Sequence, residues 1–180
     1  MPSTAGIVSS GIRYQVGNIG PSGGYVVILP SSSGNSTTQY FEIPKNDWDG
    51  GAADPSLIWG STSILVSGLT AGVGTGATNT ALIIAQDSTA NTAARKADAL
   101  TYGGYSDWFL PSMAELRFIY DSRSIVGTSN SDQYKSSEQG SANPTIYNAG
   151  LFFFNGTNSG ADPKQVSRRT RPMRSFFARY

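Results

Sequence analysis

The chain has 180 residues, of which 38% are hydrophobic and 14% are charged, and it contains neither cysteine nor histidine. Without these two residue types it has no disulfide, no thiolate nucleophile, no zinc site of the Cys/His kind and no imidazole to act as general base. The 13 basic and 12 acidic residues leave a net charge of +1, too small to attract nucleic acid or anionic lipid over a distance.

The N-terminal segment is predicted to be an arm. Residues 1–12 carry no charge and are rich in small side chains, which is not the pattern of a core strand. We expect an arm over residues 1–15 that contacts another subunit or another protein, because free termini are ordered mainly when something holds them. One domain is predicted over residues 16–180.

Two short strands are predicted next, over residues 25–29 and 39–43. Glycines and prolines bound the first strand, and a polar loop separates it from the second. This arrangement is typical of an antiparallel hairpin. The turn-rich residues 44–62 that follow hold Trp48 and Trp59, which predicts an ordered loop held by aromatic burial.

Three helical segments are predicted in the middle of the chain. The glycine-rich run "GVGTGA" precedes a helix for which Thr78 or Asn79 is the expected N-cap. This run lacks the lysine of a P-loop, so we interpret its glycines as a tight backbone turn. Alanines at helical spacing predict a second helix over residues 93–100. Ser112 and Glu115 form a capping box for a third, which ends near Ser122.

The remainder of the chain is predicted to be strand and loop. "GLFFFNG" is an apolar strand stopped by Asn-Gly, which is a hairpin signal. Strands near both ends with helices between them predict an α+β fold whose terminal strands pair. We expect an antiparallel sheet and two to three helices.

"GYSDWFLPSMAEL", residues 104–116, resembles the signature of the Legionella collagen-like adhesin C-terminal domain family. Four further segments are similar in the same order: "VGNIGPSGGYVVIL", "GVGTGATNTALIIA", "YKSSEQ" and "RTRPMRSF". Together they cover about residues 16–177. The resemblance implies a C-type-lectin-like domain with paired terminal strands, of the type found in bacteriophage genomes and bacterial surface proteins. A fold of this kind does not by itself imply sugar binding.

The signature residues are interpreted as structural. Trp108 and Leu110 are expected in the core, with Asp107 bound to backbone amides or to an arginine. Alternate C-terminal arginines are expected to pair with Asp107, Glu115 or Glu138. The residues assigned to this structural signature are Gly104, Asp107, Trp108, Leu110, Pro111, Glu115, Arg171, Pro172 and Arg174.

Two segments supply candidates for surface binding. "NDWDGGAAD" offers Asp47, Trp48 and Asp49 in a polar loop, but lacks the closing glutamate of an EF-hand, so we predict neither a metal nor a cofactor. "YKSSEQ" offers Tyr134, Lys135 and Glu138. Lys135 stands where the family has tryptophan, which leaves no aromatic platform there.

The apolar runs are far shorter than the roughly 20 residues of a membrane span, and the N-terminus has no secretory signal pattern. We therefore expect synthesis in a host cytoplasm and release by lysis, as for a bacteriophage virion protein displayed as head decoration, minor capsid or tail appendage. Its expected partners are other virion proteins, further copies of itself with a trimer favoured, and a host-surface glycan or protein. We expect no enzymatic activity, nucleic-acid binding or membrane insertion.

Two other classes of function stay open. A bacterial adhesin that binds glycan or matrix would require an export signal or a parent repeat region. A glycosidase would require two carboxyl groups facing each other roughly 5–9 Å apart across a cleft, with Asp107 as the first candidate. The sequence nominates no second carboxylate for that pair.

Overall fold

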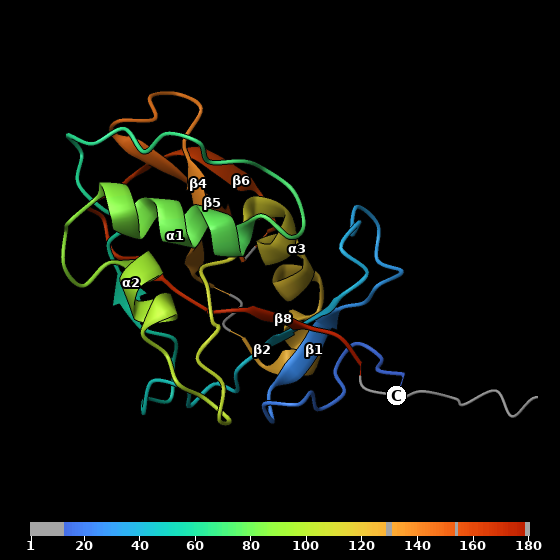
Figure 1. The fold of residues 1–180 in the computed structure, drawn as a ribbon. Coiled ribbons are helices and arrows are strands. Elements are labelled where there is room, and N and C mark those ends of the chain that lie inside the picture. The colour runs from blue at the N-terminus through green and yellow to red at the C-terminus, as the bar shows by residue number, and fades with distance from the viewer. Residues whose placement is uncertain (1–12, 129–130, 154, 179–180) are drawn as a thin grey trace, which may run out of the picture.

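The computed structural model describes residues 13–128, 131–153 and 155–178. Within these residues the chain forms two sheets and four helices (Figure 1). Strands lie near both ends of the chain and the helices lie between them, so the predicted α+β class is confirmed. The predicted arm over residues 1–15 falls almost entirely outside the described residues.

The smaller sheet joins the two ends of the chain. Its strands are β1 (Tyr25–Ile28), β2 (Tyr40–Ile43) and β8 (Arg174–Phe176), in the order β1-β2-β8, and both pairings are antiparallel. The predicted hairpin is therefore confirmed, and it meets the C-terminal strand through β2. The ring of Tyr14 packs edge-on against Phe176 at 5.3 Å, so the two ends of the described chain meet.

The larger sheet has five strands in the order β3-β7-β4-β5-β6 and is mixed rather than purely antiparallel. Its strands are β3 (Ser56–Leu57), β4 (Gln133–Gln139), β5 (Tyr147–Phe152), β6 (Asn158–Pro163) and β7 (Arg168–Arg169). The parallel pair is short, because β4 and β7 are in register only at Tyr134 and Arg169. The predicted antiparallel sheet is therefore present as the smaller sheet, whereas the larger sheet is mixed.

The described residues form four helices, whereas two to three were predicted. The helices are α1 (Gly76–Gln86), α2 (Ala93–Asp98), α3 (Met113–Asp121) and the short α4 (Arg123–Val126). The N-cap of α1 is Thr75 and not Thr78 or Asn79. Asn79 instead lies inside the helix, where its side chain bonds the backbone N–H and C=O of Thr70. The capping box at the start of α3 is confirmed.

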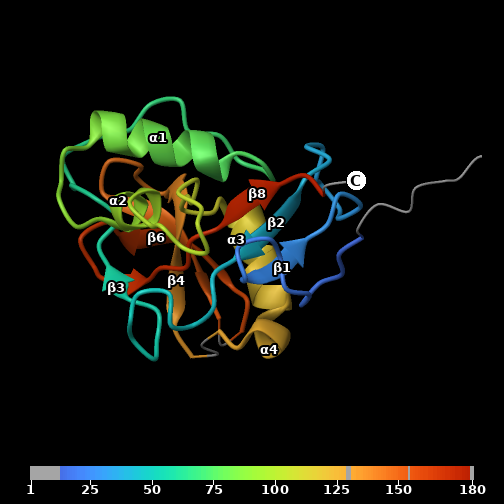
Figure 2. The ribbon, with the colours of Figure 1, turned by 60° about the horizontal axis from the view of Figure 1, so that its bottom comes forward.

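Two apolar clusters form the core. In the first, α3 packs against both sheets (Figures 1 and 2), and its buried side chains Leu116 and Ile119 meet strand residues such as Phe41 and Leu151. The second lies around Trp59, beneath α1 and α2. None of the helices in the described part of the chain is long and apolar enough to cross a bilayer.

Candidate functional site

The signature segment, residues 104–116, begins at a tight turn. Gly103 and Gly104 have φ of +60° and +83°, and the flanking Tyr102 and Tyr105 exchange backbone hydrogen bonds of 3.0 and 3.1 Å. Two central residues with positive φ are the requirement of a type I′ turn, which glycine meets without strain. The turn directs Trp108 inward, where its indole N–H donates to the carbonyl of Tyr105 at 3.1 Å.

Asp107 is held by an arginine, as predicted. Arg174 Nε and Nη2 donate to its two carboxylate oxygens at 2.6 and 3.0 Å, and Arg174 Nη1 donates to Glu42 at 2.5 Å. Burial alone would lower the pKa of Arg174, but the hydrogen bonds to Asp107 and Glu42 outweigh it and raise that pKa. Asp107 is 56% exposed and Glu42 is fully buried, so this guanidinium neutralises a carboxylate inside the protein.

Phe109, Leu110 and Pro111 connect the segment to three other parts of the chain. Phe109 and Met173 exchange backbone hydrogen bonds of 2.8 and 2.9 Å. The N–H of Leu110 donates to the hydroxyl of Thr80 in α1 at 2.9 Å. The carbonyl of Pro111 accepts a 2.8 Å hydrogen bond from a backbone N–H of β4. The segment therefore joins β4, α1 and the chain that leads into β8.

Glu115 connects the start of α3 to the glycine-rich run "GVGTGA". Its carboxylate accepts from the backbone N–H of Ser112 and of Gly74, each at 2.7 Å, and burial raises its pKa against the effect of these hydrogen bonds. A Cβ at Gly76 would lie 2.3 Å from the same carboxylate. The glycine-rich run thus closes around a carboxylate of the protein itself, which agrees with our interpretation of the run as a backbone turn.

Two of the predicted surface residues lie inside the protein. Trp48 and Tyr134 donate to Asp54 at 2.8 and 2.7 Å, and Arg171 pairs with the same carboxylate at 2.8 Å. Trp48 is 7% exposed and Tyr134 is fully buried, so the prediction that they form a binding surface is wrong. Their polar groups are directed at a buried aspartate, and Arg171 and Pro172 are buried with them.

Lys135 was predicted at the surface but is fully buried. Its ammonium donates to Asp162 and Asn148, each at 2.7 Å, and Arg168 shares Asp162 at 3.1 Å. Burial lowers the pKa of Lys135 to about 8 although Asp162 acts in the opposite direction. At neutral pH the lysine still carries its charge, so it serves as a buried counter-ion.

The remaining three candidates are closer to solvent. Asp47 and Asp49 are exposed, and Asp49 pairs with Lys96. Glu138 is partly buried and accepts from the backbone N–H of Met113 at 2.8 Å, and burial raises its pKa. Among the described residues no three His, Cys, Asp or Glu side chains are grouped closely enough to hold a metal ion.

The C-terminal arginines form ion pairs, but with partners that differ from those predicted. Only Asp107 of the three expected acids pairs with a described arginine, because Glu115 and Glu138 bind the backbone at the start of α3. The observed pairs are Arg168–Asp162, Arg169–Asp132, Arg171–Asp54, Arg174–Glu42 and Arg174–Asp107.

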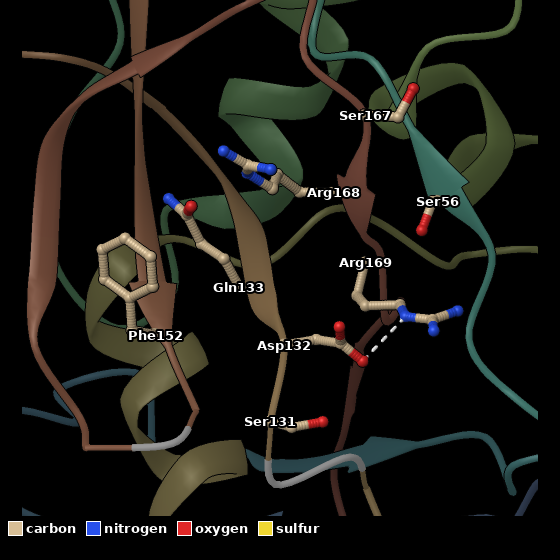
Figure 3. A pocket seen from close by; sticks show the side chains of 8 residues that line it. All are labelled: Ser56, Ser131, Asp132, Gln133, Phe152, Ser167, Arg168 and Arg169. Atoms are coloured by element: carbon tan, nitrogen blue, oxygen red, sulfur yellow. Dashed lines mark hydrogen bonds and ion pairs between the residues drawn. The ribbon is translucent and has the colours of Figure 1, made fainter.

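A cleft of about 280 Å³ opens where β4 and β7 diverge (Figure 3). Gln133 and Phe152 are register partners at its edge, and the Gln133 amide is directed toward Arg168. Asp132 pairs with Arg169 at 3.0 Å between the two strands. The lining residues are Ser56, Ser131, Asp132, Gln133, Phe152, Ser167, Arg168 and Arg169.

Hydrogen-bond donors without a partner among the described residues lie at this cleft. Both polar atoms of the Gln133 amide are buried and have no partner among the described residues, which is costly for a side chain that is only 7% exposed. Arg168 is 35% exposed and bonds Asp162 only through Nε. A second cleft, of about 260 Å³ beside Glu138, has no such group, since the Gln139 amide there is fully paired.

Sequence reasoning missed the cleft because its residues carry no motif. Gln133 and Phe152 lie far apart in the chain, and only the pairing of β4 with β5 brings them together. The one available signal was Arg168 and Arg169, which we assigned to ion pairs. Both arginines form ion pairs through Nε, but with Asp162 and Asp132 and not with the expected acids, and among the described residues the terminal amino groups of Arg168 have no partner.

No family model and no curated protein matches this chain. The α+β architecture is therefore what the structure supplies, and the likeness of the signature segment to a family stays a prediction.

Proposed function

We propose that this protein is a bacteriophage virion component, a C-type-lectin-like domain displayed on the head or on a tail appendage, and that it acts by binding rather than by catalysis. The observation that carries the proposal is the role of the signature carboxylates. Asp107 accepts two hydrogen bonds from Arg174, and Glu115 caps α3 and accepts a hydrogen bond from Gly74 in the glycine-rich run. The residues that most resemble catalytic acids are engaged in holding elements together.

The arrangement of the chain ends supports the fold assignment within this proposal. A hairpin near the N-terminus and the last strand share one sheet, and Tyr14 packs on Phe176. Sequence segments that resemble the family lie along β1, α1, β4 and β8, in the order that the family has. The low charge and the absence of cysteine suit a protein that acts outside the cell after lysis.

Exposed apolar side chains support association with further copies or with other virion proteins. Ile19, Ile125 and Phe177 are 51%, 59% and 63% exposed. Gly17 lies against Ile125, which brings two of these regions together. We expect a homo-oligomer, with a trimer favoured, in which the arm over residues 1–15 contributes contacts.

The test is particle association. Density-purified particles from a lysate that contains the protein are analysed by mass spectrometry, and the protein is expected in the particle fraction at a constant ratio to the capsid protein. Deletion of residues 1–15 is expected to reduce that ratio and to lower the oligomeric state measured by light scattering. Recovery of the intact protein only from bacterial envelopes would favour the adhesin alternative and contradict the proposal.

A further inference from the structure

We propose that the cleft between β4 and β7 binds a small monocarboxylate, with Arg168 as its principal contact. This inference rests on the proposed binding function, since it names the ligand class for one surface of the domain.

The first step is the balance of donors and acceptors. The polar groups of the lining are the guanidinium groups of Arg168 and Arg169, the amide of Gln133, the hydroxyls of Ser56, Ser131 and Ser167, and the carboxylate of Asp132. The guanidinium groups only donate, the hydroxyls and the amide both donate and accept, and the carboxylate of Asp132 is engaged by Arg169 Nε at 3.0 Å. A lining that consists mainly of donors is complementary to a ligand rich in acceptor oxygens.

The second step is charge. Arg168 and Arg169 line the cleft together with one carboxylate, Asp132, so the lining carries a surplus of one positive charge. Asp162 does not cancel this surplus, because it is shared between Arg168 and the buried ammonium of Lys135. One excess positive charge matches a singly charged anion, and a planar guanidinium matches a carboxylate in a bidentate arrangement.

The third step is size and shape. A cleft of about 280 Å³ is at the lower end of small-molecule sites, which favours a ligand no larger than one ring. The ring of Phe152 borders it and offers an apolar surface. Gly150 lies beside Gln133, and a Cβ at this position would approach the Gln133 amide nitrogen to 2.9 Å. The absence of a side chain at 150 leaves room for the amide to meet a ligand oxygen.

The experiment measures binding of four probes, glucuronate, glucose, acetate and phosphate, to the purified full-length protein by two-dimensional NMR titration. Sodium glucuronate is expected to bind with a Kd of about 1 mM, as suits so small a ligand. Glucose has the same ring without the carboxylate and is expected not to bind. Acetate is expected to shift the same resonances at higher concentration. Equal binding of glucose and glucuronate, tighter binding of phosphate, or no binding of either carboxylate would overturn the proposal.

Three variants localise the site. Arg168→Gln is expected to weaken glucuronate at least about tenfold, and Asp162 keeps Lys135 as its partner, so the fold is retained. Gln133→Met keeps the shape of the side chain and is expected to weaken binding without lowering the melting temperature. Arg117→Gln removes an arginine of α3 whose Nη2 donates to Asn158, and is expected to leave binding unchanged. Loss of binding in Arg117→Gln but not in Arg168→Gln would refute the assignment.

Failure of this inference is separable from failure of the proposed function. A protein that binds no carboxylate and is still found in purified particles contradicts only the ligand. A protein that binds glucuronate through Arg168 and is absent from particles contradicts the virion assignment and leaves the cleft in place.

Discussion

Arg174 pairs with two carboxylates that differ in their exposure to solvent. Its guanidinium is 5% exposed and pairs with the fully buried Glu42 on one side and with the half-exposed Asp107 on the other. It also lies over the ring of Tyr105, 3.8 Å from the centroid. Removing a partner from a buried charge is far more costly than removing one from an exposed charge.

The first prediction compares the two sides of this network. Arg174→Met leaves Glu42 buried without a counter-ion and is expected to lower the free energy of unfolding by about 3–5 kcal/mol. Asp107→Asn leaves the pair of Arg174 with Glu42 intact and is expected to cost about 1 kcal/mol or less. Urea denaturation of both variants measures these values. An Asp107→Asn variant as unstable as Arg174→Met would show that the exposed side of the network dominates.

The second prediction concerns Lys135 and pH. Its pKa is about 8 in the folded protein and about 10.4 in an unfolded chain. Between these values the unfolded chain holds more protons than the folded protein, so the free energy of unfolding should rise as pH increases from 8 toward 9.5. Burial also lowers the pKa of Lys164 to about 8, so Lys135→Met should reduce this rise without abolishing it, whereas Lys45→Met, at an exposed position, should leave it unchanged. Denaturant titrations at several pH values decide between these outcomes.

At the scale of elements, the start of α3 shows which local rules can be read from the sequence. The capping box of Ser112 and Glu115 was predicted because both partners lie within four residues. The N-cap of α1 was misplaced because Asn79, a good cap by type, is recruited by the loop at Thr70. Local signals identified helices and strands well, and tertiary hydrogen bonds decided where they begin.

The third prediction separates the two roles of Glu115. Ser112→Ala removes the cap hydroxyl and is expected to cost about 1 kcal/mol. Glu115→Ala removes the partners of Ser112 and Gly74 together and is expected to cost clearly more. Thermal and urea unfolding of the two variants gives the comparison. Equal losses would show that the contact with Gly74 contributes nothing to stability.

At the scale of the whole molecule, β4 joins the two apolar clusters. Tyr134 belongs to the first cluster, and the carbonyl of Ser136 accepts from the indole of Trp59 in the second at 2.9 Å. The signature segment makes a parallel connection, because Leu110 packs in the second cluster and Phe109 in the first. The clusters are therefore coupled through two segments, β4 and the signature segment.

The fourth prediction follows from this coupling. Unfolding is expected to be a single transition, with far-UV circular dichroism and tryptophan fluorescence giving the same midpoint. Tryptophan fluorescence sums Trp48, Trp59 and Trp108, of which Trp59 lies in the second cluster, and the sheet signal includes the first. Two separated midpoints would contradict the coupling.

The sequence predicted the α+β class and the scaffold role of Trp108, Leu110 and Asp107, because each depends on periodicity or on residue type. It did not predict the interior position of Tyr134 and Lys135. Polar residues on a strand ordinarily face solvent. Only the fold shows that Asp54 and Asp162 lie inside the protein, where they bind Tyr134 and Lys135. The cleft also escaped prediction, since it arises from the divergence of strands far apart in sequence.

The most direct test of a structural role for Asp107 and a binding role for Arg168 compares Asp107→Asn with Arg168→Gln in two assays, the free energy of unfolding and the Kd for glucuronate. We predict that Asp107→Asn changes stability slightly and leaves the Kd unchanged. Arg168→Gln is expected to raise the Kd at least about tenfold and to change stability by about 1 kcal/mol or less. Loss of glucuronate binding in Asp107→Asn but not in Arg168→Gln would contradict these predictions. A chemical turnover by the unsubstituted protein that Asp107→Asn abolishes would contradict them as well.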